Sequence, residues 1–112
     1  MVKDLSTKKI GNITYKASAS TLSVVKITGK RVSVPSTVKI NNKIYKVTSI
    51  APNAAKGNKT LERIVFGKNI KSIGANAFNG CKKLKYVKFN SKAKIGKNAF
   101  KNIHRKARII KK

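Results

Sequence analysis

The sequence predicts a β-rich α/β solenoid, with short strands, short helical turns and a small β-hairpin region that caps its N-terminal end. Two observations support this fold class. An apolar pattern recurs every 22–23 residues along the second half of the chain, and the region before it alternates apolar and polar residues between turn sequences. The 112 residues suffice for one modest core. No Pro/Gly/Ser-rich linker separates the two regions, so we expect one continuous domain.

The first half of the repeat reads Ile-Gly-x-Asn-Ala-Phe. It occupies residues 73–78 and recurs at 95–100, and a degraded copy lies at 50–55. The pattern is too short for a full helix, and its glycine is a typical site for a bend. We therefore expect a bend followed by a helical turn, which places Phe78 or Phe100 in the core.

The second half of the repeat reads Leu-x-x-Ile-x-Phe at residues 61–66, with a similar copy at 84–89 and a weaker one at 107–112. Its last two apolar residues are two apart, which is the spacing of a strand with one buried face. Ile64 and Phe66 are therefore expected to point inward. One such unit cannot bury its apolar face alone, whereas about three stacked units can.

The N-terminal region differs from the repeats. Its apolar residues, among them Ile13 and Tyr15, alternate with polar ones, which predicts short strands that close one end of the solenoid. The predicted organisation is a disordered tail over 1–9, a β cap over 10–46, and repeats over 47–112 in units of about 47–69, 70–93 and 94–112.

Two segments resemble the BspA-like leucine-rich repeat family. Residues 34–50 are similar to the entry into those repeats, and residues 73–87, with a Gly-Cys pair, are close to the repeat consensus. The resemblance covers about residues 31–103, extends less closely over residues 12–30, and implies a bacterial cell-surface or secreted protein with a role in adhesion. Departures from the pattern are Ala55, where the family has Phe, and the stretch 101–104, which replaces the Gly-Cys run.

The chain carries 28 Lys and Arg against 2 Asp and Glu, a formal net charge of +26. Such a chain repels itself and attracts polyanions. All but four of the cations are lysines, which act as hydrated point charges, so diffuse attraction is favoured over a shaped anion site. The same lysines also serve solubility, and the composition does not separate the two roles.

The residues available for catalysis are few. Asp4 and Glu62 are the two carboxylates of the chain and lie in different regions of the sequence, which argues against carboxylate catalysis and a carboxylate-bound metal. Cys81 and His104 are about one repeat apart, but no third group orients the histidine. The family resemblance instead implies that Cys81 is an apolar filler. We predict no catalytic residue, no cofactor and no metal site, and therefore no enzyme.

The outward side of the stacked strands is the natural contact surface. With strands in register, we expect ladders of Glu62, Lys85 and Arg108, of Arg63, Tyr86 and Ile109, and of Val65, Lys88 and Lys111. The candidate binding face consists of Arg63, Lys85, Tyr86, Lys88, Arg108 and Lys111. A solvated sheet face without a ligand is the alternative interpretation.

These features predict a non-catalytic binding or adhesion module whose ligand is a protein or an anionic polymer, such as teichoic acid or a sulfated glycan. The alternatives are a structural spacer or terminal segment of a larger surface protein, and nonspecific binding of polyanions, including nucleic acid. The family resemblance implies a location at the cell surface or outside the cell. The start of the chain lacks the apolar run of a signal peptide, and no stretch approaches membrane-spanning length. The oligomeric state stays open.

Overall fold

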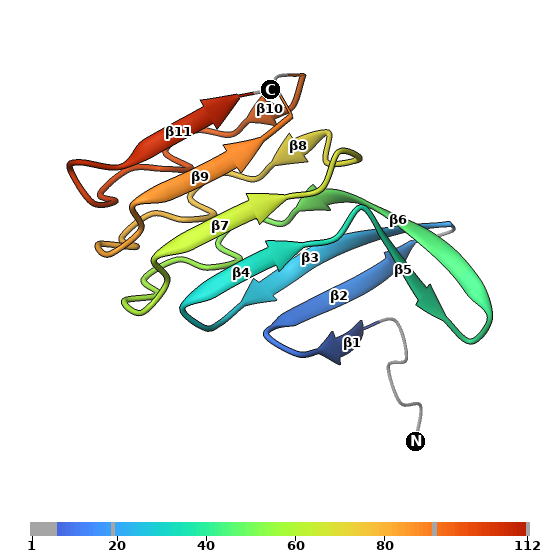
Figure 1. The fold of residues 1–112 in the computed structure, drawn as a ribbon. Helices are drawn as coiled ribbons and strands as arrows, with labels where there is room; N and C mark the ends of the chain where they lie inside the picture. The colour runs from blue at the N-terminus through green and yellow to red at the C-terminus, as the bar shows by residue number, and fades with distance from the viewer. Residues whose placement is uncertain (1–6, 19, 91, 112) are drawn as a thin grey trace.

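The computed structural model describes residues 7–18, 20–90 and 92–111, which form two β-sheets with one layer behind the other (Figure 1). Along the repeats, each coil of the chain contributes one strand to each sheet. The strands of successive coils therefore run parallel to one another in both sheets. The described part of the chain measures 44 × 31 × 23 Å.

The larger sheet has seven strands, six of them in the order β1-β2-β3-β6-β8-β10, while β5 pairs with β6 beside this path. The pairs β1–β2, β2–β3 and β5–β6 are antiparallel, and the pairing from β3 through β6 and β8 to β10 is parallel. Its strands are β1 (Thr7–Ile10), β2 (Ile13–Ser18), β3 (Thr21–Ile27), β5 (Thr37–Ile40), β6 (Lys43–Ile50), β8 (Ser72–Ile73) and β10 (Lys94–Ile95).

The smaller sheet is entirely parallel, in the order β11-β9-β7-β4. Its strands are β4 (Arg31–Val34), β7 (Arg63–Phe66), β9 (Tyr86–Phe89) and β11 (Arg108–Lys111). Residues 31–34 were expected within the N-terminal cap, yet β4 is an edge strand of this sheet and pairs with β7. Its side chains alternate between exposed and buried in the same way as those of the first repeat strand.

The core lies between the two sheets. The inward orientation predicted for Ile64 and Phe66 is confirmed, because their side chains are 0% and 5% exposed. The expected placement of Phe78 in the core is confirmed as well, and its ring contacts those of Phe66 and Phe100 at centroid distances of 5.7 and 5.4 Å. The inward-facing side chains of the smaller sheet therefore form one side of the core. The phenylalanines of the turns pack against its edge.

The predicted helical turns, and with them the α/β part of the fold class, are wrong, because residues 7–18, 20–90 and 92–111 contain no helix. Asn76 and Asn98 have φ angles of 58° and 59°, a left-handed conformation that ends any right-handed helical path. The N–H of Phe78 donates to the carbonyl of Ala99, in the next coil, at 2.8 Å. Hydrogen bonds of this kind join coils instead of closing a helix, and the fold is a β-solenoid.

The predicted disordered tail is wrong for residues 7–9. These residues belong to β1, which pairs antiparallel with β2. All four residues of β1 are exposed, which is why the sequence there has no burial pattern from which a strand could be inferred. Residues 1–6 of the predicted tail lie outside the described residues.

Candidate binding face

The outward side of the smaller sheet, which we call the strand face, carries two rows of side chains that the parallel register sets. Across β4, β7, β9 and β11, the first row, which we call the arginine row, consists of Arg31, Arg63, Tyr86 and Arg108. The second row consists of Ser33, Val65, Lys88 and Ile110. Neighbouring strands lie about 4.8 Å apart, so consecutive members of a row are side by side.

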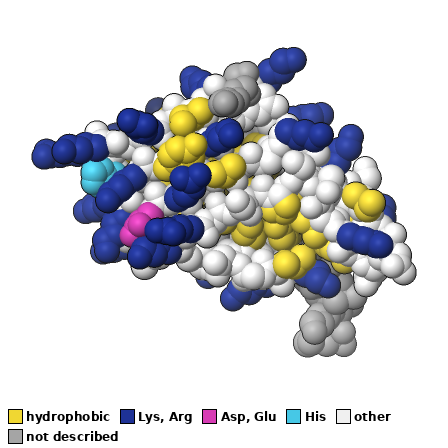
Figure 2. Space-filling model, viewed as in Figure 1, with side chains coloured by type: hydrophobic (Ala, Val, Ile, Leu, Met, Phe, Trp, Pro, Cys, Tyr) yellow, Lys and Arg dark blue, Asp and Glu magenta, His cyan; other side chains and the backbone are white. Residues whose placement is uncertain are grey.

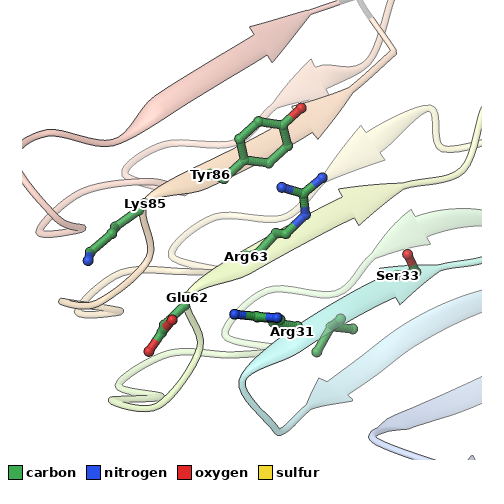
Figure 3. Close-up of a pocket in the computed structure, with 7 residues that line it drawn as sticks. Arg31, Ser33, Glu62, Arg63, Lys85 and Tyr86 are labelled. Atoms are coloured by element: carbon green, nitrogen blue, oxygen red, sulfur yellow. The ribbon is translucent and has the colours of Figure 1, made fainter.

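Arg63 and Tyr86 are in direct contact within the arginine row. The guanidinium Cζ of Arg63 lies 4.1 Å from the centroid of the Tyr86 ring, which is a cation–π arrangement. Figure 3 shows the Arg63 side chain extending from β7 beside Tyr86 on β9. The predicted pairing of Arg63 with Tyr86, and of Val65 with Lys88, is confirmed by the register.

A further set of positions lies where the strands begin. The N–H of Glu62 donates to the Lys30 carbonyl at 2.7 Å, and the N–H of Lys85 donates to the Glu62 carbonyl at 2.8 Å, so these residues follow one another across the sheet. Lys30 Nζ lies 3.6 Å from Glu62 Oε2, a solvent-exposed pair worth less than about 1 kcal/mol. In Figure 2 an acidic side chain lies among Lys and Arg side chains. With these positions included, the strand face combines one carboxylate with the cations of Lys30, Arg31, Arg63, Lys85, Lys88 and Arg108.

The predicted ladders are wrong at strand β11. Arg108 pairs with Tyr86, and Lys111 pairs with the buried Phe89, each one position from the predicted partner. The shift arises because the coil from β9 to β11 is one residue shorter than the coil from β7 to β9. Arg108 therefore joins the arginine row. Ile109 and Lys111 pair with Val87 and Phe89, whose side chains are buried between the sheets. Lys111 therefore does not belong to the strand face.

Arg31 and Ser33 are residues of the strand face that the sequence analysis missed. The alternation Arg-Val-Ser-Val at 31–34 resembles Arg-Ile-Val-Phe at 63–66 and could have revealed a first repeat strand. The spacing from Arg31 to Arg63 is longer than one repeat, however, because the β5–β6 hairpin is inserted between their strands. A search for the regular repeat period could not connect them.

An open hollow of about 610 Å³ lies on the strand face, among the side chains that Figure 3 labels. Its lining consists of Arg31, Val32, Ser33, Glu62, Arg63, Lys85 and Tyr86. Three cations, one carboxylate and two hydroxyls surround it, and Val32 is itself buried in the core. Such a lining donates hydrogen bonds to anions and accepts them from hydroxyls.

Cys81 and His104 make separate hydrogen bonds. The buried Cys81 thiol donates to the Ala55 carbonyl, with an S–O distance of 3.0 Å. Burial raises the pKa of this thiol to about 11, although a backbone hydrogen bond from Asn58 acts in the opposite direction. The nucleophilic thiolate is therefore disfavoured. His104 Nδ1 accepts the N–H of Lys106 at 3.0 Å.

The described residues contain no group of three or more His, Cys, Asp and Glu side chains that could hold a metal ion. No helix in this part of the chain has the length and apolar character needed to cross a membrane. Within the same residues, every buried side-chain nitrogen and oxygen has a hydrogen-bond partner.

Comparison with known proteins places this arrangement of coils beside a described family. The model of the BspA type leucine-rich repeat region matches residues 6–106 with six copies. That range includes the larger sheet and strands β4, β7 and β9 of the smaller sheet, whereas β11 lies beyond it. A comparison with curated protein sequences finds no match.

Several solved structures share the fold. A leucine-rich cell surface protein from Faecalibacterium prausnitzii A2-165 is 27% identical with a TM-score of 0.73, and the match covers 88% of this chain and 28% of that one. A leucine-rich repeat protein from Bacteroides ovatus is 21% identical with a TM-score of 0.73, covering 92% and 37%. One from Bacteroides capillosus is 17% identical with a TM-score of 0.72, covering 96% and 99%. The chain thus spans less than two fifths of the first two proteins.

Proposed function

Because this chain belongs to the BspA-type leucine-rich repeat family, we propose that it is a non-catalytic binding or adhesion module that engages an anionic partner through its strand face. The similar protein from Faecalibacterium prausnitzii is a leucine-rich cell surface protein, and solenoids of leucine-rich repeats present extended binding surfaces. Family membership and this similarity support our inference that the chain is part of a cell-surface or secreted protein. The anionic partner is either an acidic protein or an anionic polymer such as teichoic acid or a sulfated glycan.

The observation that supports this proposal is the charge of the strand face. Arg31, Arg63, Lys88 and Arg108 occupy the outward rows of a four-stranded sheet. Lys85 lines the adjoining hollow together with Glu62, which pairs with Lys30. A row of like charges on a rigid surface raises the local concentration of anions and speeds their association. A partner with complementary negative charge gains affinity and orientation from the same surface.

A structural spacer in a larger surface protein is the second candidate, and the last coil favours it. Ile95 and Ile109 are 39% and 43% exposed, whereas their counterparts one coil earlier, Ile73 and Val87, are 1% and 0% exposed. A further coil stacked on β10 and β11 would bury both isoleucines. In a spacer of this kind, the charge of the strand face would have no role in ligand binding.

Charge reversal on the strand face separates the two functions. We expect the triple variant Lys85→Glu, Lys88→Glu and Arg108→Glu to lose binding to immobilised heparin, lipoteichoic acid and acidic serum albumin, whichever of these the wild-type chain binds at low ionic strength. Biolayer interferometry gives the affinities. Circular dichroism and thermal unfolding establish that the variant keeps its fold.

The matched control reverses Lys56, Lys97 and Lys101, three exposed lysines of the turns between the sheets. It has the same net charge as the triple variant, and we expect it to keep most of the binding. Equal losses in both variants would indicate a response to net charge alone. Full binding by the strand-face variant would contradict the proposal and leave the spacer role.

A further inference from the structure

We propose that the arginine row binds a sulfated polysaccharide whose chain runs across the strands, from β4 towards β11. This inference rests on the proposed function and names the class of ligand for the same face. Its basis is the placement of the arginines, the contact between Arg63 and Tyr86, and the polar lining of the adjoining hollow. Each of these is a property of the tertiary structure rather than of the composition.

The arginines are not distributed as the lysines are. The chain has 28 cations, and only Arg31, Arg63, Arg105 and Arg108 are arginines. Three of these four occupy one row on one face. Lysine serves solubility as well as arginine does, but only the planar guanidinium presents paired donors that match the oxygens of a sulfate, carboxylate or phosphate. The row therefore has the side chain suited to oriented anion contacts at the positions where the register aligns them.

The geometry of the row suits a linear ligand. Arg31 and Arg63 lie directly opposite one another on neighbouring parallel strands, about 4.8 Å apart along the sheet. Arg108 lies two strands beyond Arg63, on the other side of Tyr86. Like charges opposite one another on paired strands are destabilising. An anion bound along the row would offset that repulsion.

Tyr86 orients part of the row before any ligand binds. The guanidinium carbon of Arg63 lies over the Tyr86 ring, 4.1 Å from its centroid. A cation–π contact of this kind uses no N–H donor, so the donors remain available to an anion. Both residues are on strands rather than loops, so little conformational entropy is lost when a ligand binds. Arg63 and Tyr86 therefore form a preorganised anion contact at the centre of the row.

The surroundings favour a polysaccharide over a folded protein. A protein interface typically depends on buried apolar or aromatic anchors in pockets, and the adjoining hollow is lined by charged and hydroxyl side chains around the buried Val32. A polysaccharide offers both sulfates for the arginines and hydroxyls for the Glu62 carboxylate and the Ser33 hydroxyl. The Glu62 carboxylate, at the edge of the arginine row, can accept hydrogen bonds from the hydroxyls of such a ligand. It would repel a ligand whose surface is uniformly anionic.

Nucleic acid fits the row less well. Single strands bind chiefly by stacking their bases on open aromatic rings. Tyr86 is the one aromatic side chain in the two rows, and Arg63 covers one of its ring faces. The phosphates would find cations, but the bases would lack a platform.

The test keeps the net charge constant. In the variant Arg31→Lys, Arg63→Lys and Arg108→Lys, each guanidinium becomes an ammonium, so diffuse attraction is unchanged. We expect its affinity for heparin, measured by isothermal titration calorimetry at physiological ionic strength, to fall at least about tenfold, equivalent to about 1.4 kcal/mol. Arg105→Lys is the matched control outside the row and should bind as the wild type does. Tyr86→Ala should weaken binding, whereas Tyr86→Phe, which keeps the ring under Arg63, should weaken it less.

The outcomes separate this inference from the proposed function. Wild-type affinity in the Lys-for-Arg variant, or no heparin binding by the wild type at low ionic strength, overturns the arginine row as a sulfated-polysaccharide site. If the Lys-for-Arg variant binds normally while the charge-reversal variant does not, the strand face remains the proposed binding surface and only the proposal for the arginine row is rejected. Tighter, arginine-dependent binding of polyglutamate or of a charge-matched oligonucleotide overturns the ligand class. Thermal unfolding of every variant confirms that folded proteins are compared.

Discussion

The Phe100 ring lies parallel to the Phe78 ring one coil earlier, with 5.4 Å between centroids and 5° between planes. Phe78 also meets Phe66 edge-on at 5.7 Å, and Phe100 stacks on Phe89 at 6.0 Å. The two phenylalanines thus join the turns to the strands of the smaller sheet. In the coil before Phe78 the equivalent residue is Ala55, so the aromatic stack begins at Phe78.

Replacing Phe78 with alanine should destabilise the chain by about 3–5 kcal/mol, because its side chain is fully buried and the substitution leaves a cavity. The same change at Phe100 should cost clearly less, since Phe100 is only partly buried and packs at the edge of the core. Urea unfolding followed by circular dichroism gives both values. Equal losses at the two positions would contradict the difference in burial that distinguishes them.

Gly74 should not tolerate a side chain. A Cβ added there would lie 2.4 Å from the Pro52 nitrogen and 2.7 Å from the Ala51 carbonyl carbon, and both are backbone atoms of the preceding coil. We expect Gly74→Ala to destabilise the chain by about 1–3 kcal/mol as the coils are forced apart. Lys97→Ala, at an exposed turn position, should be within about 0.5 kcal/mol of the wild type. A neutral effect of Gly74→Ala in urea unfolding would show that the coils can separate freely.

Asn76 should be replaceable by glycine more readily than by alanine. Its φ of 58° is a left-handed conformation that costs most residues about 1–2 kcal/mol, while glycine adopts it freely. The Asn76 Oδ1 also accepts a hydrogen bond from Asn79 Nδ2 at 3.1 Å, and both substitutions remove it. We therefore expect the midpoint of thermal unfolding to fall in the order wild type, Asn76→Gly, Asn76→Ala. The reverse order for the two variants would rule out backbone conformation as the reason for asparagine here.

Cys81 should make stability depend on pH in the alkaline range. Burial raises the pKa of its thiol from 9.0 to about 11 in the fold, so the unfolded chain loses this proton first. The contribution is complete below pH 9 and is lost as the pH rises from about 9 to about 11. The stability difference between the wild type and Cys81→Ala should therefore shrink across that window. A difference that is constant with pH would contradict the raised pKa.

Added salt should raise the thermal stability of this chain. A net charge of +26 destabilises the compact state by self-repulsion, and at physiological ionic strength charges more than about 8 Å apart are largely screened. We expect the midpoint of thermal unfolding to increase with sodium chloride from low to physiological concentration. A midpoint that falls over this range would mean that attractive surface pairs outweigh the repulsion.

The strands and the core of the repeats could be predicted from the sequence, because burial of Ile64 and Phe66 requires a period of two that is visible without a structure. The turns could not. A segment such as 73–78 is short enough for either a helical turn or a non-helical bend, and the choice depends on hydrogen bonds to the neighbouring coil, such as that from Phe78 to Ala99. The residues around Phe78 in the sequence do not indicate which residue of another coil will accept this hydrogen bond.

The candidate site was predictable only in part for the same reason. Arg63 and Tyr86 were correctly paired because one regular repeat separates them. Arg108 and Lys111 were displaced by a coil that is one residue shorter, and a shift of one residue moves each side chain to the other face of the sheet. Arg31 was missed because a hairpin separates its strand from the repeats.

By itself, the sequence determined the repeat, the family, the inward-facing apolar positions of the repeat strands and the strongly cationic character of this protein. Each of these depends on residue type and on spacing within one coil. Only the tertiary structure decided which residues stand beside one another on the strand face. Parallel pairing aligns residues from different coils, and the length of each coil sets that alignment to the single residue. The arginine row exists because coils of unequal length bring Arg31, Arg63, Tyr86 and Arg108 into one register.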